Sequence, residues 1–317
     1  AFVIDNVSHK GGTERVLSNL INSLSSSYEI TVCSINKGEG YGFLNDNERI
    51  KFSKGENRVS KIINTVFYLK KQEFDSVLII SMGRLSFELN PLLKIFRCKS
   101  KVISCDHVAI KSFSWILQKM KMVSYTFADE VIVLTDSDRD YIKRKNRFIK
   151  KINTINNSSS FAKLDISFSE LLSAKARDNT VLAVGRLTEQ KNFKILIKMW
   201  SALPEDIKSN WILKIAGDGE LKQELENQIA TNNLNDKVFL LGNISNIKEE
   251  YKKSAFLCMT SLYEGLPMTL IEAKDFGLPV VSFDCNTGPK EIINGDGFLI
   301  DCFDEVRYIH AMIKLMR

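Results

Sequence analysis

The sequence predicts an α/β protein with two domains, each built on a doubly wound parallel sheet. Strand-like and helix-like runs alternate along most of the 317 residues, which is the pattern of repeated βα units. The strand-like runs are almost continuously apolar, as expected for strands that are covered on both faces. This length suits two domains of ordinary size. A polar, weakly periodic stretch at residues 161–178 is the expected linker between domains at 1–160 and 179–317.

The composition is that of a soluble globular protein, with 44% hydrophobic and 26% charged residues. No apolar run approaches the ~18–20 residues of a membrane span, and no secretory signal peptide is visible. The six cysteines show no C-x-x-C spacing and lie mostly in strand-like runs, which predicts buried, reduced thiols in a cytoplasmic protein. Because Ala1 stands directly on an apolar strand, we expect that a few natural residues precede it.

The charge is uneven along the chain. Residues 1–165 carry a net formal charge of +9, whereas the remainder carries −3. This asymmetry indicates two domains with different partners. Nucleic acid would suit the basic half, but the sequence contains no recognition motif for it.

The first domain opens with a strand at Phe2–Asp5 and a loop that contains Gly11 and Gly12. Two glycines let the backbone turn tightly and approach a ligand, and Thr13 is placed to cap the helix at 14–24. A plain strand-to-helix connection explains the same residues equally well. The stretch 36–54, rich in glycine, asparagine and charged residues, is predicted to be a long loop. Further strands are expected at 30–35, 77–81, 102–105, 131–135 and 152–155, and further helices near 59–72, 86–96, 111–127 and 137–147.

His107 lies just past the strand at 102–105, where ligands bind in doubly wound sheets. A lone histidine is more often structural, so the residue alone leaves its role open. Asp136 and Asp138 form an Asp-x-Asp that invites a metal interpretation. They open a helix, however, where aspartate is favoured by capping and by the helix dipole, and we interpret them as capping residues.

Two basic segments stand out, at 111–121 and 143–151. The first mixes lysines with Trp115, Ile116 and Met120, so it is either an interfacial amphipathic helix or a core-packed helix with a solvated basic face.

In the second domain a strand ends at Gly185, and Arg186 and Lys191 flank the turn that follows. Two cations at the carboxyl end of a strand suit a diphosphate, with arginine as a fork and lysine as a point charge. Two ordinary surface charges are the alternative. The next strand, at 211–216, closes at Gly217, and another ends before Asn243.

The segment Ser261–Ala273 follows a short apolar strand at 255–259 and is the most informative part of the chain. Pro267 is expected in the first helical turn, which leaves the amides of the next three residues, 268–270, without intrahelical partners. Such a helix start is an anion site, and a diphosphate fits it. Glu264 and Glu272 would then accept hydrogen bonds from sugar and ribose hydroxyls. A loop glutamate and a solvated helix glutamate are the alternative.

Glu264 and Glu272 match the Glu-x(7)-Glu motif, and this part of the chain resembles the retaining glycosyltransferases of the GT-B fold, especially glycosyltransferase family 4 (group 1). The resemblance continues in residues 277–282 and 287–292 and covers nearly the whole chain. It implies two Rossmann-like domains that face each other across a cleft. Asn157-Ser158 replaces the Asn-Pro usual near this point, and the final helix that usually crosses back to the first domain is not visible.

The resemblance implies a metal-independent hexosyltransferase without a cofactor. It would move a sugar from a nucleotide sugar, UDP-linked, to a glycan or lipid-linked acceptor in bacterial lipopolysaccharide or capsule biosynthesis. The implied location is cytoplasmic, with peripheral contact to the anionic inner face of the plasma membrane. The implied catalytic residues are His107, Arg186, Lys191 and Glu264, and Asp106 is expected to help orient His107. The implied donor-binding residues are Gly12, Gly185, Arg186, Lys191, Gly217, Asn243, Glu264, Gly265, Leu266, Pro267, Met268, Thr269 and Glu272. The implied acceptor-binding residues are His9, Gly11, Gly12 and Thr13.

Two alternative functions stay open at this point. The chain could be a non-catalytic, nucleotide-binding scaffold for another transferase, although intact Glu264, Arg186 and Lys191 argue against that. It could also be a sugar-nucleotide epimerase of the same fold, which would release free UDP without an acceptor. The sequence leaves the donor sugar, its base, the acceptor, the linkage and the oligomeric state undetermined.

Overall fold

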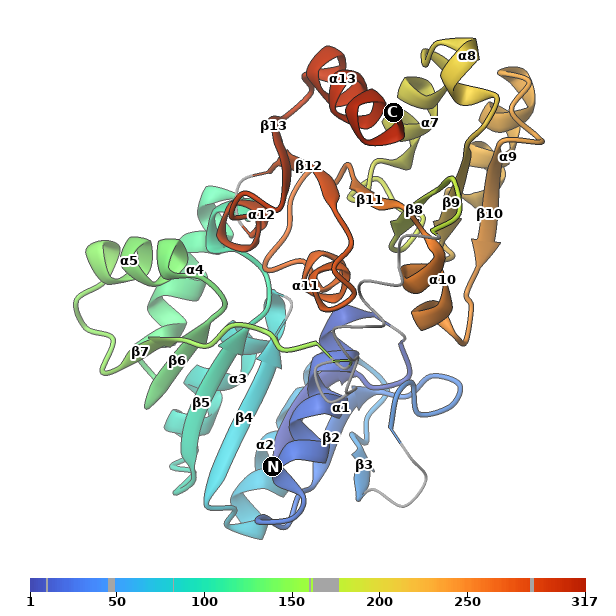
Figure 1. The fold of residues 1–317 in the computed structure, drawn as a ribbon. Helices are drawn as coiled ribbons and strands as arrows, with labels where there is room; N and C mark the ends of the chain where they lie inside the picture. The colour runs from blue at the N-terminus through green and yellow to red at the C-terminus, as the bar shows by residue number, and fades with distance from the viewer. Residues whose placement is uncertain (10, 45–48, 82, 160, 162–176, 286–287) are drawn as a thin grey trace. The chain divides into compact units, whose positions relative to one another are not determined.

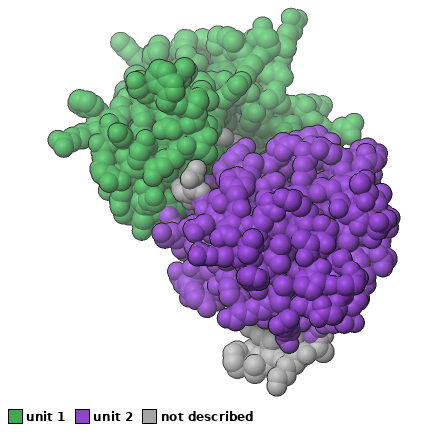
Figure 2. All heavy atoms as spheres, turned by 90° about the horizontal axis from the view of Figure 1, so that it is seen from above, with its two compact units in different colours: residues 1–158 green, residues 159–317 purple. Residues whose placement is uncertain are grey.

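A computed structural model describes residues 1–317 except 10, 45–48, 82, 160, 162–176 and 286–287. The chain divides into two compact units, residues 1–158 and 159–317 (Figure 2). Most of the expected linker at 161–178 lies outside the described residues.

Unit 1 contains a seven-stranded parallel sheet in the order β3-β2-β1-β4-β5-β6-β7 (Figure 1). Its strands are β1 (Phe2–Asn6), β2 (Val32–Asn36), β3 (Ile50–Phe52), β4 (Ser76–Ser81), β5 (Lys101–Asp106), β6 (Glu130–Val133) and β7 (Ile152–Thr154). Its helices are α1 (Gly12–Leu24), α2 (Arg58–Gln72), α3 (Arg84–Ile95), η1 (Ile110–Ser112), α4 (Trp115–Tyr125) and α5 (Asp136–Lys145). The prediction of a loop throughout 36–54 is wrong at β3, a three-residue edge strand that is too short to show a clear period.

Unit 2 contains a six-stranded parallel sheet in the order β10-β9-β8-β11-β12-β13. Its strands are β8 (Thr180–Val184), β9 (Ile212–Ala216), β10 (Val238–Gly242), β11 (Phe256–Met259), β12 (Val280–Asp284) and β13 (Gly297–Asp301). Its helices are α7 (Phe193–Ser201), α8 (Glu205–Lys208), α9 (Lys222–Thr231), α10 (Ile247–Lys253), α11 (Met268–Asp275), α12 (Pro289–Ile292) and α13 (Glu305–Met316).

Alternating strand residues of unit 1 face opposite sides of its sheet. Val3 and Ile79 belong to a buried cluster that includes side chains of α2, α3, α4 and α5. Their chain neighbours Ile4 and Ile80 belong to a second cluster, which includes Leu17 of α1. Because both faces of the sheet are covered, its inner strands are apolar almost throughout, and this is why the sequence predicted all of the strands except β3.

The order of strands reverses once in each sheet. β1 lies between β2 and β4, and β8 lies between β9 and β11. The chain leaves β1 and β4 toward opposite faces of the first sheet, and it leaves β8 and β11 toward opposite faces of the second. The carboxyl edge of each sheet is therefore open between these two strands. Ligands of doubly wound sheets bind at such switch points.

The cysteines follow the predicted pattern in part. All six are free, and Cys33, Cys105, Cys258 and Cys285 are buried, which raises the pKa of each of these four thiols to about 12. Cys98 is half-buried and Cys302 is exposed, because each follows the end of a helix or strand.

Candidate functional site

The switch point of unit 2 begins with a close contact between two glycines. Gly185 directly follows β8, and a side chain at Gly217 would lie 1.8 Å from the Gly185 carbonyl oxygen. A side chain at Gly185 would lie 2.9 Å from Cε of Lys191. Both positions also have positive φ, which favours glycine. These glycines let the loop after β8 fold back so that the Lys191 stem crosses the end of the strand.

Lys191 and Glu264 form an ion pair, with 2.6 Å between Lys191 Nζ and Glu264 Oε1. The two side chains are only 17% and 9% exposed, so the charges are largely shielded from water. Two hydrogen bonds hold their loops together. The Thr260 side chain donates from Oγ1 to the Lys191 carbonyl at 3.0 Å, and the Leu262 amide donates to the Gln190 carbonyl at 2.8 Å. Two residues that the sequence singled out separately therefore meet.

The helix α11 begins one residue later than expected. Pro267 is its N-cap, with φ −70° and ψ 113°, and Met268 is the first helical residue. The predicted free amide of Leu270 is wrong, because this N–H donates to the Pro267 carbonyl at 3.1 Å. The amides of Met268 and Thr269 precede the first intrahelical hydrogen bond, and Thr269 Oγ1 is buried without a hydrogen-bond partner in the described part of the chain. These groups form a donor-rich helix start.

The turn before α11 is fixed by a second loop. A side chain at Gly288 would lie 2.6 Å from the Gly265 carbonyl oxygen and 2.6 Å from Cδ of Pro267. Leu266 is buried between them. These contacts fix the shape of the turn before α11.

Glu272 is buried at 2% exposure, and the hydroxyl of Tyr251 donates to its Oε2 at 2.7 Å. Tyr251 lies in α10 and stacks on Phe276, with 5.4 Å between ring centroids. Sequence reasoning missed Tyr251. Its one signal was an aromatic residue in an otherwise strongly charged short helix.

Arg186 and Asn243 occupy more open positions than the residues above. Both side chains are exposed, at the ends of β8 and β10 respectively. Arg186 makes no ion pair with any residue that the structure describes, so its guanidinium is available to an anion at this edge of the sheet.

His107 follows β5 in unit 1, and its amide donates to the Ser81 carbonyl at 2.9 Å. Burial lowers the pKa of His107 to about 4, against a weak opposing effect of Asn157, so the imidazole is neutral near pH 7. Neither ring nitrogen makes a hydrogen bond of normal geometry with the residues described.

The expectation that Asp106 orients His107 is wrong. The Asp106 carboxylate instead accepts from the Tyr125 hydroxyl and pairs with Lys121, at 3.0 Å from Lys121 Nζ. Lys121 is 1% exposed. A buried carboxylate needs such a partner, because an unpaired charge in the interior is very costly.

The loop after β1 carries the expected acceptor residues. His9 is exposed, with its Nε2 3.0 Å from Nδ2 of Asn6, and Gly12 is also exposed. The prediction that Thr13 caps α1 is wrong. Gly11 is the N-cap, its amide donates to the Glu14 carboxylate at 3.2 Å, and Thr13 is buried in the first turn.

Asp136 and Asp138 lie in the first turn of α5, but the cap is Thr135, whose hydroxyl accepts from the Asp138 amide at 3.2 Å. Asp136 pairs with Arg139 at 2.7 Å. In the ranges that the structure describes, no group of three or more His, Cys, Asp or Glu side chains could hold a metal ion.

The basic segment 111–121 differs from the expectation of a core-packed helix with a solvated basic face, whereas the alternative of an interfacial helix stays a prediction. Lys121 points into the core, whereas the exposed face of α4 is mostly apolar and carries Trp115, Ile116, Met120 and Val123. Lys119 lies over the Trp115 ring at 4.9 Å.

Two kinds of ligand group therefore suit the switch point of unit 2. The ammonium of Lys191, the exposed Arg186 and the start of α11 favour an anion. Glu264 and Glu272 provide carboxylate oxygens close to these donors in sequence and in the fold, and carboxylates accept hydrogen bonds from hydroxyls.

Comparison with known proteins points to one family. The family model described as "Glycosyl transferases group 1" matches residues 168–317. The amylovoran biosynthesis glycosyltransferase AmsD of Erwinia amylovora is 41% identical over 305 residues, covering 94% of this chain and 84% of AmsD. An α-1,4-N-acetyl-D-galactosaminyltransferase of Campylobacter jejuni is 32% identical over 311 residues, covering 94% of this chain and 83% of its own.

Solved structures agree on the fold. Anabaena HepE in complex with UDP-glucose matches with a TM-score of 0.80 at 17% identity, over 100% of this chain and 89% of HepE. The apo form of the lipopolysaccharide outer core galactosyltransferase WaaB matches with a TM-score of 0.73 at 21% identity, over 99% of this chain and 89% of WaaB. The predicted fold class, GT-B with two Rossmann-like parallel-sheet domains, is confirmed.

Proposed function

The chain belongs to the family of group 1 glycosyltransferases, and from this we propose that it transfers a sugar from a UDP-sugar to a hydroxyl group with retention at the anomeric carbon. Support for a UDP-linked donor comes from solved proteins of the same fold, including HepE in complex with UDP-glucose. The site itself supports the diphosphate of such a donor, through Lys191, Arg186 and the start of α11.

The observation that carries the proposal is the Lys191–Glu264 pair beside the start of α11. Both partners are largely buried, and a buried pair persists because each charge satisfies the other. A diphosphate would replace the Glu264 carboxylate as the partner of Lys191. Its oxygens would also accept hydrogen bonds from the amides of Met268 and Thr269. Glu264 would then accept hydrogen bonds from hydroxyls of the donor sugar.

The roles follow from the chemistry of the transfer. The bond between the anomeric carbon and the diphosphate oxygen breaks, and a bond to the acceptor oxygen forms on the same face. Lys191 and Arg186 stabilise the charge that develops on the leaving diphosphate, and preorganised electrostatics of this kind is usually the largest catalytic effect. The acceptor proton passes to a diphosphate oxygen, so no side-chain base is needed.

The remaining residues position the two substrates. Glu272, whose carboxylate is held by the Tyr251 hydroxyl, accepts hydrogen bonds from the two ribose hydroxyls of the donor. His107, neutral near pH 7, can donate one hydrogen bond and accept another, which suits sugar hydroxyls. We assign no metal to the reaction, since protein cations take its place at the diphosphate. Full turnover in the presence of a chelator is the expected result.

For the acceptor we propose a glycan on a lipid carrier in bacterial surface polysaccharide biosynthesis. AmsD is named for amylovoran biosynthesis, and the Campylobacter relative is named for an acceptor ending in PP-undecaprenol. No described helix is long and apolar enough to cross a membrane. The exposed apolar face of α4 supports peripheral contact with the inner face of the plasma membrane.

The test is a panel of nucleotide sugars, with free UDP, the transferred sugar and the anomeric configuration followed by NMR. A retaining transferase gives an α-linked product from an α-linked UDP-sugar and needs an acceptor for fast turnover. Conversion to an epimeric sugar without acceptor would assign the chain to epimerisation. Binding of UDP with no turnover on any donor would assign it to a scaffold role.

A further inference from the structure

A pocket lies entirely within unit 1, at the switch point of its sheet. It has a volume of about 380 Å³, within the range of roughly 300–1,000 Å³ that is usual for small-molecule sites. Asp5 at the end of β1 and Gly83 after β4 line it, so the pocket opens between the two strands where the order reverses. This is the position at which doubly wound sheets bind ligands, and none of the expected acceptor residues lines it.

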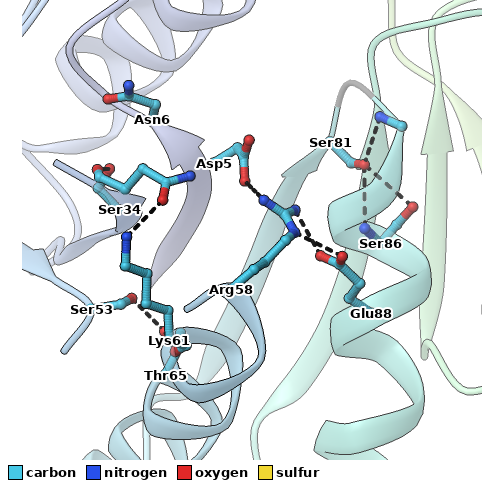
Figure 3. Close-up of polar contacts among 12 residues, drawn as sticks. Asp5, Asn6, Ser34, Ser53, Arg58, Lys61, Thr65, Ser81, Ser86 and Glu88 are labelled. Carbon is cyan, nitrogen blue, oxygen red and sulfur yellow. Dashed lines mark hydrogen bonds and ion pairs between the residues drawn. The ribbon is translucent and has the colours of Figure 1, made fainter. Parts of the chain in front are cut away.

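Arg58 forms one wall, and its charge is already balanced. Its guanidinium makes a bidentate contact with Glu88, at 2.8 Å and 2.7 Å, and a third contact with Asp5 Oδ1 at 2.7 Å (Figure 3). This network raises the pKa of Arg58, chiefly through the hydrogen bond to Glu88. The Asp5 carboxylate is thereby fixed at the pocket wall, where its second oxygen can accept a hydrogen bond from a ligand hydroxyl.

Lys121 reaches the pocket from α4, but its donors are occupied as well. Its Nζ contacts Asp106 Oδ2 at 3.0 Å, the Gly83 carbonyl at 2.9 Å and Ser86 Oγ at 3.1 Å. An ammonium group has three donors, so these three partners use all of them. Lys121 holds the loop after β4 in place and offers nothing further to a ligand.

Arg84 is the cation of this pocket whose charge is not balanced within the described residues. It is exposed, makes no ion pair with them, and is the first residue of α3, where the helix dipole adds positive potential. Phe87 and Phe113 supply apolar walls. The pocket thus combines aromatic surface, a fixed carboxylate and an unpaired guanidinium fork.

We propose that this pocket binds an acidic sugar residue of the acceptor, with the sugar carboxylate on Arg84. The Asp5 carboxylate accepts a hydrogen bond from a hydroxyl of the sugar ring. The side chains of Phe87 and Phe113 cover the apolar face of the sugar. A guanidinium binds a carboxylate through two parallel hydrogen bonds, which accounts for an arginine at this position. The proposal rests on the transferase function above and specifies the chemical class of its acceptor.

The test is an NMR titration of the isotopically labelled chain, residues 1–317, with glucuronate, glucose and inorganic phosphate. Glucuronate should saturate a site in residues 1–158, and glucose should bind about tenfold or more weakly, as expected for loss of a charged hydrogen bond. Arg84→Gln should reduce glucuronate affinity to the level of glucose. The matched control is Lys94→Gln, which removes an exposed charge near the other end of α3 and should leave the affinity unchanged.

Three results would overturn the proposal: no saturable glucuronate binding, equal affinity for glucose and glucuronate, or an Arg84→Gln variant that binds like the wild type. Phosphate that binds as tightly as glucuronate and depends on Arg84 would show a bare oxyanion site and would also overturn it. A separate titration with UDP reports on the transferase function alone. Failure of UDP to bind contradicts that function, whereas failure of glucuronate contradicts only the acidic acceptor.

Discussion

At the level of single residues, Glu264 and Glu272 have different surroundings, so substitutions at the two positions should affect UDP affinity and turnover differently. Glu264 pairs with Lys191, whereas Glu272 is buried against Tyr251. If Glu264 contacts the transferred sugar, Glu264→Gln should bind UDP nearly as well as the wild type while single-turnover rates fall. Glu272→Gln should lose about one to two decades of UDP affinity, since a hydrogen bond to a charged group is worth roughly 1.5–3 kcal/mol.

Calorimetry with UDP beside single-turnover kinetics measures both effects. Tyr251→Phe is the control for the Glu272 site, because it removes the hydroxyl that holds the carboxylate and keeps the ring that stacks on Phe276. Loss of UDP affinity in Glu264→Gln with normal affinity in Glu272→Gln would reverse the two roles.

His107 should make stability depend on pH. Its folded pKa of about 4 lies below the ordinary value of 6.5, so the unfolded chain takes up the proton first as the pH falls. Stability from this residue is therefore complete above about pH 6.5 and is lost between about pH 6.5 and 4, by up to about 3 kcal/mol. Urea unfolding of wild type and His107→Gln across this range measures the difference. His310→Gln, at an exposed position, is the control, and an identical pH dependence of His107→Gln and wild type would contradict the prediction.

Site residues could be predicted from the sequence where a local motif marks them. Their interaction partners from distant parts of the chain could not. Glu264 and Lys191 each stood out in their own loops, but the 2.6 Å contact between them depends on loops 73 positions apart. Lys121 was grouped with surface lysines because its neighbours are basic and apolar, yet it is buried on Asp106. The residues next to a lysine in sequence do not show which distant carboxylate it pairs with in the fold.

At the level of elements, α4 presents an apolar face that is not covered in unit 1. Trp115, Ile116, Met120 and Val123 are all 44–67% exposed. If this face meets the membrane, Trp115→Ser with Val123→Ser should weaken binding to anionic vesicles by roughly tenfold or more, given about 1.5–3 kcal/mol for burying one large apolar side chain.

Vesicle sedimentation measures this change, and Val306→Ser on α13, at a similarly exposed valine, is the matched control. Raised salt should weaken binding further through Lys119 and the exposed basic residues at 143–145, because surface attraction is screened over about 10 Å at 0.1 M salt. Equal binding of the double variant and the wild type would leave α4 without a role at the membrane.

Elements buried on both faces were predicted best, and exposed or short ones worst. The central strands read as continuous apolar runs, so β1, β4, β5, β8 and β11 were found within one or two residues. The edge strand β3 was missed because three residues with a lysine in the middle carry no clear period. The start of α11 moved by one residue, since proline is tolerated both at the cap and in the first turn.

At the level of the whole molecule, the two units carry different chemistry. The basic first half contains the pocket at β1/β4, with its aromatic walls and the unpaired Arg84. The second half contains the Lys191–Glu264 pair and the start of α11. The repeated switch point explains why one fold provides two ligand positions in one chain. The strand pattern predicted the parallel, doubly wound class of both sheets, although it missed the edge strand β3.

The central claim is that the switch point of unit 2 binds the diphosphate of a nucleotide sugar. Calorimetric titration of wild type, Lys191→Ala and Lys198→Ala with UDP tests it most directly, because Lys198 is an exposed lysine in α7 that pairs with Glu305 away from the site. We predict that Lys191→Ala weakens UDP binding by about 10- to 100-fold while Lys198→Ala binds like the wild type. Equal UDP affinity in all three proteins, or no binding by the wild type, would contradict the claim.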